Sequence, residues 1–226
     1  MTQGRMKIVI LKNGPYIVSG NVPLKEMIIV PKGGHYELVE GCSLPQSETY
    51  ALCRCGKSKN PPFCDGAHIK AYFNGEETAS REEYDKRAEL LEGSGLDMQD
   101  DYRCAFARFC HRDKGDAWEL IQNSNCEENI REALIAASEC PAGRLTAIDK
   151  EGNKIEPDLE PSINIIQDPE MGVSSGIYVK GYIPIESKNG EQYEPRSRVM
   201  LCRCGRSSNK PFCDATHIPA EFKDKE

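Results

Sequence analysis

The sequence from residue 53 to residue 68 reads Cys-Arg-Cys-Gly-Lys-Ser-Lys-Asn-Pro-Pro-Phe-Cys-Asp-Gly-Ala-His. It places three cysteines and one histidine within a short segment, and a second segment near the C-terminus repeats their spacing. The two sets are Cys53, Cys55, Cys64 and His68, and Cys202, Cys204, Cys213 and His217. Three thiols and an imidazole at a repeated spacing indicate a metal site rather than a cluster of small apolar cysteines. The sequence therefore predicts two metal sites of one kind.

The spacing of the first two cysteines in each set indicates which metal is bound. Zinc sites usually separate paired cysteines by two to four residues, whereas here a single arginine, Arg54 or Arg203, lies between them. A single spacer directs two thiolates around a wider object, which suits an iron–sulfide cluster in which histidine can replace cysteine. We therefore expect an iron–sulfur cluster at each set. The alternative is a zinc-binding interaction module that uses the same ligands.

Further residues match between the two segments. Each has a serine, a proline and a phenylalanine at equivalent positions before a Cys-Asp-x-x-His ending: Ser58, Pro62 and Phe63, and Ser207, Pro211 and Phe212. With these residues both segments resemble the CDGSH iron–sulfur domain of the mitoNEET type. The resemblance implies two 2Fe-2S clusters, each bound by three cysteines and one histidine, in which the histidine-bound iron is the outer one and receives the added electron.

The second segment departs from the motif at one position, where Ala215 replaces the glycine. If Asp65 and Asp214 are helix N-caps, the next residue is the first helical position, and glycine is not required there for a positive φ. We therefore expect the substitution to leave the ligands of the second site in place.

Each cysteine segment ends a longer repeat. The matching upstream segments are 7–11 with 162–166 and 18–24 with 179–185. Each half also has a turn, at Gly33-Gly34 and at Asn189-Gly190, and the second is a strong two-residue hairpin signal. Each half is therefore predicted to form short antiparallel strands, then the cluster loop and a short helix.

Halves of this size are marginal as independent domains, so we expect them to bury their apolar strand faces against each other. The mitoNEET type is a dimer with a shared β-sandwich, and the resemblance implies that this chain forms the same object as an intrachain pseudo-dimer. Two independent modules on a tether are the alternative. The expected class is α+β, with an N-terminal iron–sulfur half (1–72), a central helical, ferredoxin-like insert (73–160) and a C-terminal iron–sulfur half (161–226).

Two helices are predicted in the insert. Ser80 and Glu83 form a capping box, followed by Tyr84, Ala88 and Leu91 on one helical face and a stop near Gly93. A second helix is expected from about Cys126 to Glu139, with Ile130, Leu134 and Ala137 on its buried side.

The insert contains four cysteines, Cys104, Cys110, Cys126 and Cys140. Residues 140–145, Cys-Pro-Ala-Gly-Arg-Leu, resemble the last cysteine and following strand of bacterial-type ferredoxins, and Cys104 with Cys110 resembles a divergent one-cluster variant. The Cys-x-x-Cys-x-x-Cys run of such ferredoxins is absent. A helix between Cys126 and Cys140 holds them roughly 20 Å apart, too far to share a cluster. We therefore favour buried thiols without a metal over a further centre at Cys104, Cys110 and Cys140.

The composition restricts partners and location. The net charge of −7 argues against generic nucleic-acid binding, which relies on a basic surface. The longest early apolar run, Ile8-Val9-Ile10-Leu11, is too short for a signal-peptide core or a membrane span. Eleven cysteines without a secretory signal indicate a reducing compartment. We expect a cytoplasmic monomer with an internal pseudo-two-fold axis that binds neither nucleic acid nor membrane.

The ligand set indicates the chemistry. An oxidised cluster with three thiolates and a neutral imidazole carries one net negative charge and gains another on reduction, and nearby basic residues lower the cost of that electron. These residues are Arg54, Lys57, Lys59, Arg203, Arg206 and Lys210. One histidine per cluster should give a potential between those of plant ferredoxins and Rieske centres. Because a protonated imidazole cannot bind iron, acid should release the clusters through His68 and His217.

Electron transfer, cluster handling and redox sensing all agree with these properties. No nucleophile, paired catalytic carboxylates or nucleotide loop stands out, so an enzyme is not expected. The expected partner is a redox or cluster-acceptor protein whose identity the sequence leaves unknown.

Overall fold

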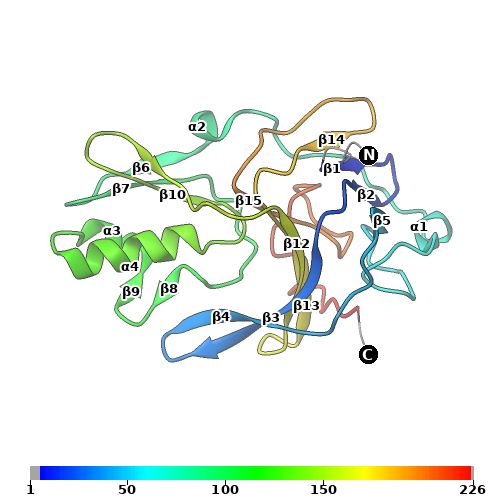
Figure 1. Ribbon diagram of the computed structural model, residues 1–226, viewed down its shortest axis with the longest axis horizontal. Coiled ribbons are helices and arrows are strands. Elements are labelled where there is room, and N and C mark those ends of the chain that lie inside the picture. The colour runs from blue at the N-terminus through cyan, green and yellow to red at the C-terminus, as the bar shows by residue number, and fades with distance from the viewer. Residues whose placement is uncertain (1–5, 225–226) are drawn as a thin grey trace.

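The computed structural model describes residues 6–224, and its β-rich part consists of two sheets built from both halves of the chain (Figure 1). One sheet has the order β14-β1-β2-β5 and the other β15-β13-β12-β3-β4. The N-terminal half contributes β1 (Lys7–Ile10), β2 (Tyr16–Ser19), β3 (Leu24–Lys32), β4 (His35–Glu40) and β5 (Thr49–Leu52). The C-terminal half contributes β12 (Ser162–Asp168), β13 (Val173–Lys180), β14 (Ile185–Ser187) and β15 (Arg198–Leu201).

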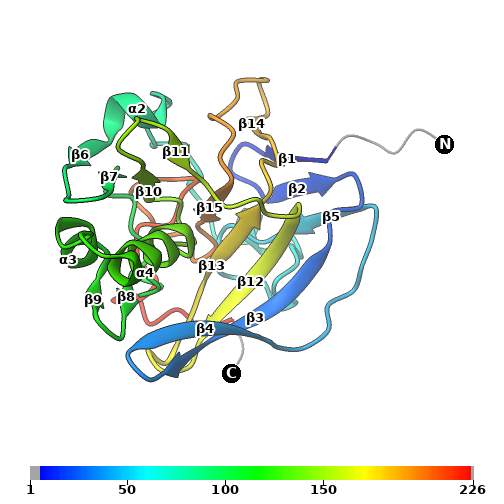
Figure 2. The same ribbon diagram turned by 60° about the vertical axis from the view of Figure 1, so that its left-hand side comes forward.

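The two halves exchange strands. Strand β14 lies parallel to β1, with Ile185 opposite Ile8, and β3 lies parallel to β12, with Leu24 opposite Ile163. All other pairings in these two sheets are antiparallel. Figure 2 shows the second sheet face on, with β3 and β4 from the N-terminal half beside β12 and β13. Strand β3 of the N-terminal half thus belongs to the sheet of β12, β13 and β15, and strand β14 of the C-terminal half belongs to the sheet of β1, β2 and β5. Each half therefore completes the sheet of the other.

One hydrophobic core joins the two sheets. Its fully buried side chains come from both halves and include Ile8, Ile10, Val18, Leu24, Ile163, Ile165, Ile177 and Ile185. The alternating burial of Ile8 and Ile10 along β1 shows the period of two expected for a strand with one face in the core. Burying this surface requires both halves, which explains why neither forms a separate module.

The predicted turns are present. Gly33 and Gly34 form the two-residue loop of the β3–β4 hairpin, and Gly33 has a φ of 62°. Asn189 and Gly190 form the turn after β14, where the Ser187 amide donates to Glu191 O and Gly190 has a φ of 90°. Glycine suits both turns because positive φ is unfavourable for other residues.

The central segment is α+β rather than helical, which corrects the sequence prediction. It contains a sheet of order β11-β10-β7-β6 with two helices packed beside it. The sheet strands are β6 (Glu89–Leu91), β7 (Asp97–Asp100), β10 (Leu145–Ile148) and β11 (Lys154–Ile155), and β8 (His111–Arg112) pairs with β9 (Gly115–Asp116). The helices are α2 (Tyr84–Arg87), α3 (Ala117–Gln122) and α4 (Glu127–Ser138).

The prediction of the first insert helix is correct for a single helical turn and wrong for the residues after it. Helix α2 ends at Arg87, and Leu91 lies in strand β6 opposite Met98. Tyr84 explains the early end, because it is fully buried and its hydroxyl donates to Gln99 O and Arg144 O of the sheet region. These tertiary contacts and the pairing of β6 with β7 outweigh the local helical pattern.

The second predicted helix is confirmed. Helix α4 has Cys126 as its N-cap and Glu139 as its C-cap, and Ala137 is buried. Ile130 and Leu134 pack partly buried against the same core. The sequence analysis did not identify α3, whose capping box of Asp116 and Glu119 was a readable signal.

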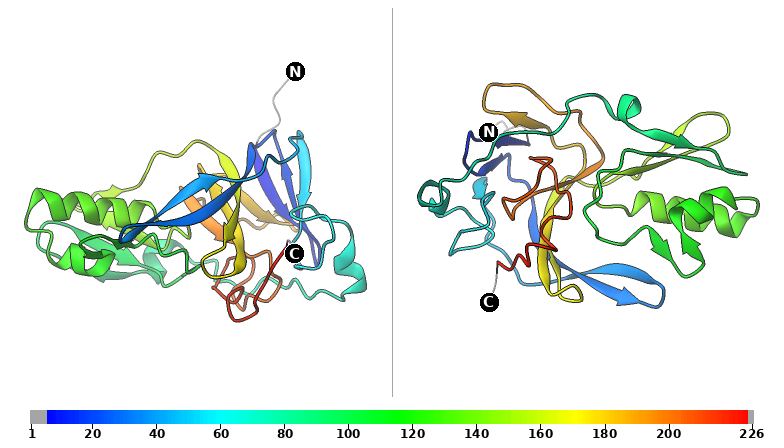
Figure 3. Two further views of the ribbon diagram at one scale, coloured as in Figure 1. Left: turned by 90° about the horizontal axis from the view of Figure 1, so that it is seen from below. Right: turned by 180° about the vertical axis from the view of Figure 1, so that it is seen from behind.

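The central segment extends from the β-rich part at the end opposite α1 (Ala67–Lys70) (Figure 3). Arg198 of β15 joins the two parts, since its buried guanidinium donates to Ala137 O, Cys140 O and Leu145 O and pairs with Glu156. In residues 6–224, no helix has the length and apolar character needed to span a bilayer. The outermost expected domain boundaries, residues 1 and 226, lie outside the described residues.

Candidate metal centres

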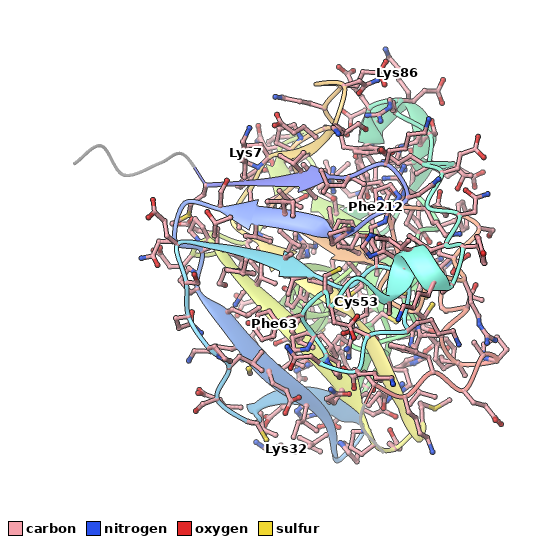
Figure 4. The ribbon with its side chains drawn as sticks, turned by 90° about the vertical axis from the view of Figure 1, so that its right-hand side faces the viewer. Lys7, Lys32, Cys53, Phe63, Lys86 and Phe212 are labelled. Atoms are coloured by element: carbon pink, nitrogen blue, oxygen red, sulfur yellow. The ribbon has the colours of Figure 1, made fainter. Side chains whose placement is uncertain are left out.

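The N-terminal set of donors, site 1, follows strand β5. Cys53 and Cys55 come just after this strand, and their Sγ atoms lie 3.6 Å apart. Cys64 Sγ lies 3.4 Å from Nδ1 of His68, which is in the short helix α1. Figure 4 shows Cys53 near the middle of the face that carries α1. Site 1 thus presents its donors as two close pairs.

The C-terminal set, site 2, repeats this geometry after β15. The Sγ atoms of Cys202 and Cys204 lie 3.6 Å apart, and Cys213 Sγ lies 3.4 Å from His217 Nδ1. The structure therefore brings together all eight predicted donors as four equivalent pairs.

The distances between donors indicate whether one metal ion or two metal atoms fit each site. Two thiolates bound tetrahedrally to one metal at about 2.3 Å lie about 3.8 Å apart, so each pair has the span to hold one metal atom. A single zinc ion would need all four donors at that spacing. Over residues 6–224, no three histidine, cysteine, aspartate or glutamate side chains converge closely enough to hold one ion. The donors of each site therefore fit two metal atoms better than one.

One thiol of each cysteine pair is readily deprotonated. The thiol of Cys55 and the amides of Ser58, Cys55 and Gly56 lower the pKa of Cys53 to about 5, against the opposing effect of burial. The same interactions, from Cys204 and from the amides of its loop, lower the pKa of Cys202 to about 6. The same interaction raises the pKa of the partner thiols, Cys55 and Cys204, so each pair favours one thiolate beside one thiol until a metal binds both.

Each ligand loop contains a buried arginine between its first two cysteines. Arg54 is 2% exposed, and its guanidinium donates to Gly75 O and Leu11 O and lies over the rings of Tyr16 and Phe73. Among residues 6–224 it forms no ion pair, and a buried charge without a counter-ion is costly. The equivalent Arg203 is also buried but pairs with Asp224. Within residues 6–224, Arg54 is therefore a buried cation held by carbonyl groups and aromatic rings, whereas Arg203 is neutralised by a carboxylate.

Hydrogen bonds within each loop fix the donors. The Ser58 hydroxyl donates to Phe63 O at 2.6 Å, and the Ser207 hydroxyl donates to Phe212 O at 2.7 Å. The motif aspartates also act alike: Asp65 accepts from the amides at 59 and 67, and Asp214 from the amides at 208 and 216.

The prediction for the residue after each aspartate is wrong. Gly66 is the N-cap of α1 with a φ of 87°, and Ala215 has a φ of 67°. Both positions are thus in the left-handed region that favours glycine. Hydrogen bonds that the Asp214 carboxylate accepts from residues 208 and 216 hold this turn, so that Ala215 adopts the conformation despite its Cβ, and the ligands of site 2 stay in place.

The two sites lie against each other. A Cβ on Gly56 would come within 2.6 Å of Cys204 O, and one on Gly205 within 2.7 Å of Cys55 O. Tyr16 lies between the loops: Arg54 covers its ring, and its hydroxyl donates to Cys202 O at 2.8 Å. Tyr16 was not among the predicted site residues, because the equivalent position in the second half is Ile177 and the repeat gives no signal there.

The sites differ in exposure. Cys213 is 4% and His217 2% exposed, whereas Cys64 and His68 are partly exposed. Burial lowers the pKa of His217 to about 4, with an opposing contribution from Asp168. Within the described chain, Nε2 of His217 is buried without a hydrogen-bond partner. The Cys–His pair of site 2 is therefore shielded from water, whereas that of site 1 is partly accessible.

Cys110 of the insert is buried and lies near the thiols of Cys104 and Cys140. Burial and the neighbouring Cys140 and Cys104 thiols raise the pKa of Cys110 to about 12. The Phe106 amide donates to Cys104 Sγ at 3.3 Å. Cys126 is exposed and lies at the other end of helix α4 from Cys140. This agrees with the prediction that a helix separates the two cysteines.

Comparison with known proteins agrees with the geometry. Residues 13–69 and 175–218 match the family model described as iron-binding zinc finger CDGSH type. The chain thus has two segments of the CDGSH type. It is similar to the CDGSH iron-sulfur domain-containing protein 3, mitochondrial, of Mus musculus, with 43% identity over 47 residues, which cover 21% of this chain and 30% of the mouse protein. No solved structure matches. The CDGSH match supports iron–sulfur binding.

Proposed function

We propose that this CDGSH-type protein binds one 2Fe-2S cluster at each site and acts in electron transfer, cluster handling or redox sensing. The ligands are Cys53, Cys55, Cys64 and His68 at site 1, and Cys202, Cys204, Cys213 and His217 at site 2. The observation that carries the proposal is the arrangement of donors as two close pairs per site. Each pair suits one iron, and two irons per site require bridging sulfides.

The surrounding residues support redox use of these clusters. Arg54 and Arg203 are buried and adjacent in sequence to the ligand cysteines, and positive charge near a cluster lowers the cost of an added electron. A neutral imidazole in place of a fourth thiolate acts in the same direction. The protein's role in this proposal is non-catalytic, with a redox or cluster-acceptor protein as partner. Cytoplasmic location and the monomeric state stay predictions.

We also propose that the halves form an intrachain pseudo-dimer. Equivalent strands make equivalent exchanges, since β3 joins β12 as β14 joins β1, in parallel orientation both times. The reciprocal contacts of Gly56 with Cys204 and of Gly205 with Cys55 support the same pseudo-two-fold relation at the sites.

A further centre in the insert is a second candidate. The observations that support it are the nearness of Cys104 and Cys140 to Cys110 and the amide hydrogen bond to Cys104 Sγ. Amides that donate to sulfur are typical of iron–sulfur sites.

Metal and sulfide analysis of anaerobically purified protein tests these proposals together. Two clusters give about four irons and four sulfides per chain and a visible absorption that dithionite bleaches. A higher iron content that falls to about four after Cys104, Cys110 and Cys140 are changed to serine supports the insert centre. A colourless protein with stoichiometric zinc from iron-replete cells contradicts the cluster proposal in favour of a zinc-binding interaction module.

A further inference from the structure

The insert covers one site and leaves the equivalent surface of the other site free. Residues Ala105, Ala107 and Phe109 pack in one buried cluster with Cys213 of site 2. Cys64, the equivalent ligand of site 1, belongs to no such cluster among the described residues and is partly exposed. Electron exchange or ligand access from solvent is therefore easier at site 1.

The surface beside His68 is apolar and exposed. Ile69 is 71% and Tyr72 94% exposed, the highest values among the large hydrophobic side chains of residues 6–224. Their counterparts near site 2 are Ile218, which is partly buried, and Glu221. Two large hydrophobic side chains next to a metal ligand indicate a contact surface rather than scattered exposure.

The loop and helix that carry this apolar surface also carry positive charge. Lys57, Lys59 and Lys70 are exposed, and none of them forms an ion pair within the described chain. At the equivalent positions site 2 has Arg206, Ser208 and Pro219. Between residues 53 and 72 the only acidic side chain is Asp65, which already accepts from two backbone amides. On a chain of net charge −7, this basic surface is local to site 1.

We propose that the face formed by Lys57, Lys59, Ile69, Lys70 and Tyr72 docks an acidic electron-carrier protein. The charge complementarity selects an acidic partner, and the exposed Ile69 and Tyr72 supply the small apolar centre of a transient interface. One electron passes from the partner, which is oxidised, to site 1, which is reduced. The electron-transfer part of this inference rests on the proposed function, whereas docking is a separate property.

The test uses the complete protein as purified and an acidic flavodoxin as the probe. Binding of oxidised flavodoxin is measured by calorimetry, and electron transfer from reduced flavodoxin by stopped-flow absorbance, each at low and high salt. The variant Lys57→Gln/Lys59→Gln/Lys70→Gln is compared with Lys25→Gln/Lys32→Gln/Lys86→Gln. This control removes the same charge from exposed positions, and Figure 4 shows Lys32 and Lys86 at opposite edges, away from Cys53.

We expect the site 1 variant to bind and react about tenfold more weakly at low salt, with the difference disappearing at high salt, while the control stays close to the parent. Tyr72→Ala should weaken binding at both salt concentrations. Equal loss in both triple variants would show a general charge effect and overturn the proposal. Binding to anionic lipid vesicles but not to flavodoxin would overturn it in favour of a membrane surface. Flavodoxin binding at this face by a protein without iron would refute the proposed function but not the docking surface.

Discussion

Exchanging glycine and alanine between the two motifs should change stability in opposite directions. Ala215 holds a φ of 67°, and the equivalent Gly66 a φ of 87°. The left-handed conformation costs a residue with a Cβ about 1–2 kcal/mol, and the greater freedom of glycine in the unfolded chain offsets about 0.4–1 kcal/mol of this. Ala215→Gly should therefore stabilise the protein by about 0.5–1 kcal/mol. Gly66→Ala should destabilise it by a similar amount, because its Cβ would meet no atom within 4 Å and only the backbone strain counts.

Thermal unfolding of the iron-loaded protein, followed by circular dichroism without oxygen, measures the effect. For a chain of this size we expect the midpoint to rise by about 1–4 °C for Ala215→Gly and to fall by a similar amount for Gly66→Ala. Ala71→Gly is the control, since Ala71 has a φ of −82° and glycine should there lower the midpoint. If Ala215→Gly lowered the midpoint, or if both exchanges moved it the same way, the left-handed turn would not be the source of the strain.

Three other changes should be measurable. Acid should bleach the clusters in two steps, because the side chain of His217 is buried whereas that of His68 is partly exposed to water. His68→Cys should remove the first step, and a single step in the parent would contradict unequal access. Arg54→Met should lower the potential of site 1 in spectroelectrochemistry by on the order of 1–2 kcal/mol, about 40–90 mV for one electron, and an unchanged potential would separate this charge from the cluster. Burial raises the pKa of Glu156, but the charges of Arg198 and Arg196 outweigh this effect, so the pKa is lower in the folded protein than in the unfolded chain. The ionised Glu156 therefore stabilises the fold at a pH above about 4.3, and this contribution is lost as the pH falls through the folded pKa. Glu156→Gln should thus cost about 3 kcal/mol in urea unfolding at neutral pH and progressively less in acid; a loss that did not depend on pH would indicate packing instead of charge.

The sequence alone determined the eight candidate donors and the repeat that contains them. Ligand spacing is a local property, and the turn residues between Cys53 and His68 bring the donors together without help from distant segments. The turns at Gly33 and Asn189, and helix α4 with its caps, were also readable for this reason, because local backbone preferences and a helical period suffice to specify them.

The tertiary structure decided which strands pair and which site is exposed. The upstream repeat showed that β3 and β14 are equivalent but not that each joins the other half's sheet, because parallel pairing depends on contacts far apart in the chain. Leu91 became part of a strand for the same reason, since pairing with β7 outweighed its helical pattern. Because the ligand spacing is the same in both motifs, nothing in the sequence indicated that Cys64 and Cys213 differ in exposure. In the folded chain, Ala105, Ala107 and Phe109 pack in one buried cluster with Cys213, whereas no such cluster within residues 6–224 contains Cys64. This difference could not be predicted from the motif, because burial depends on where the insert packs.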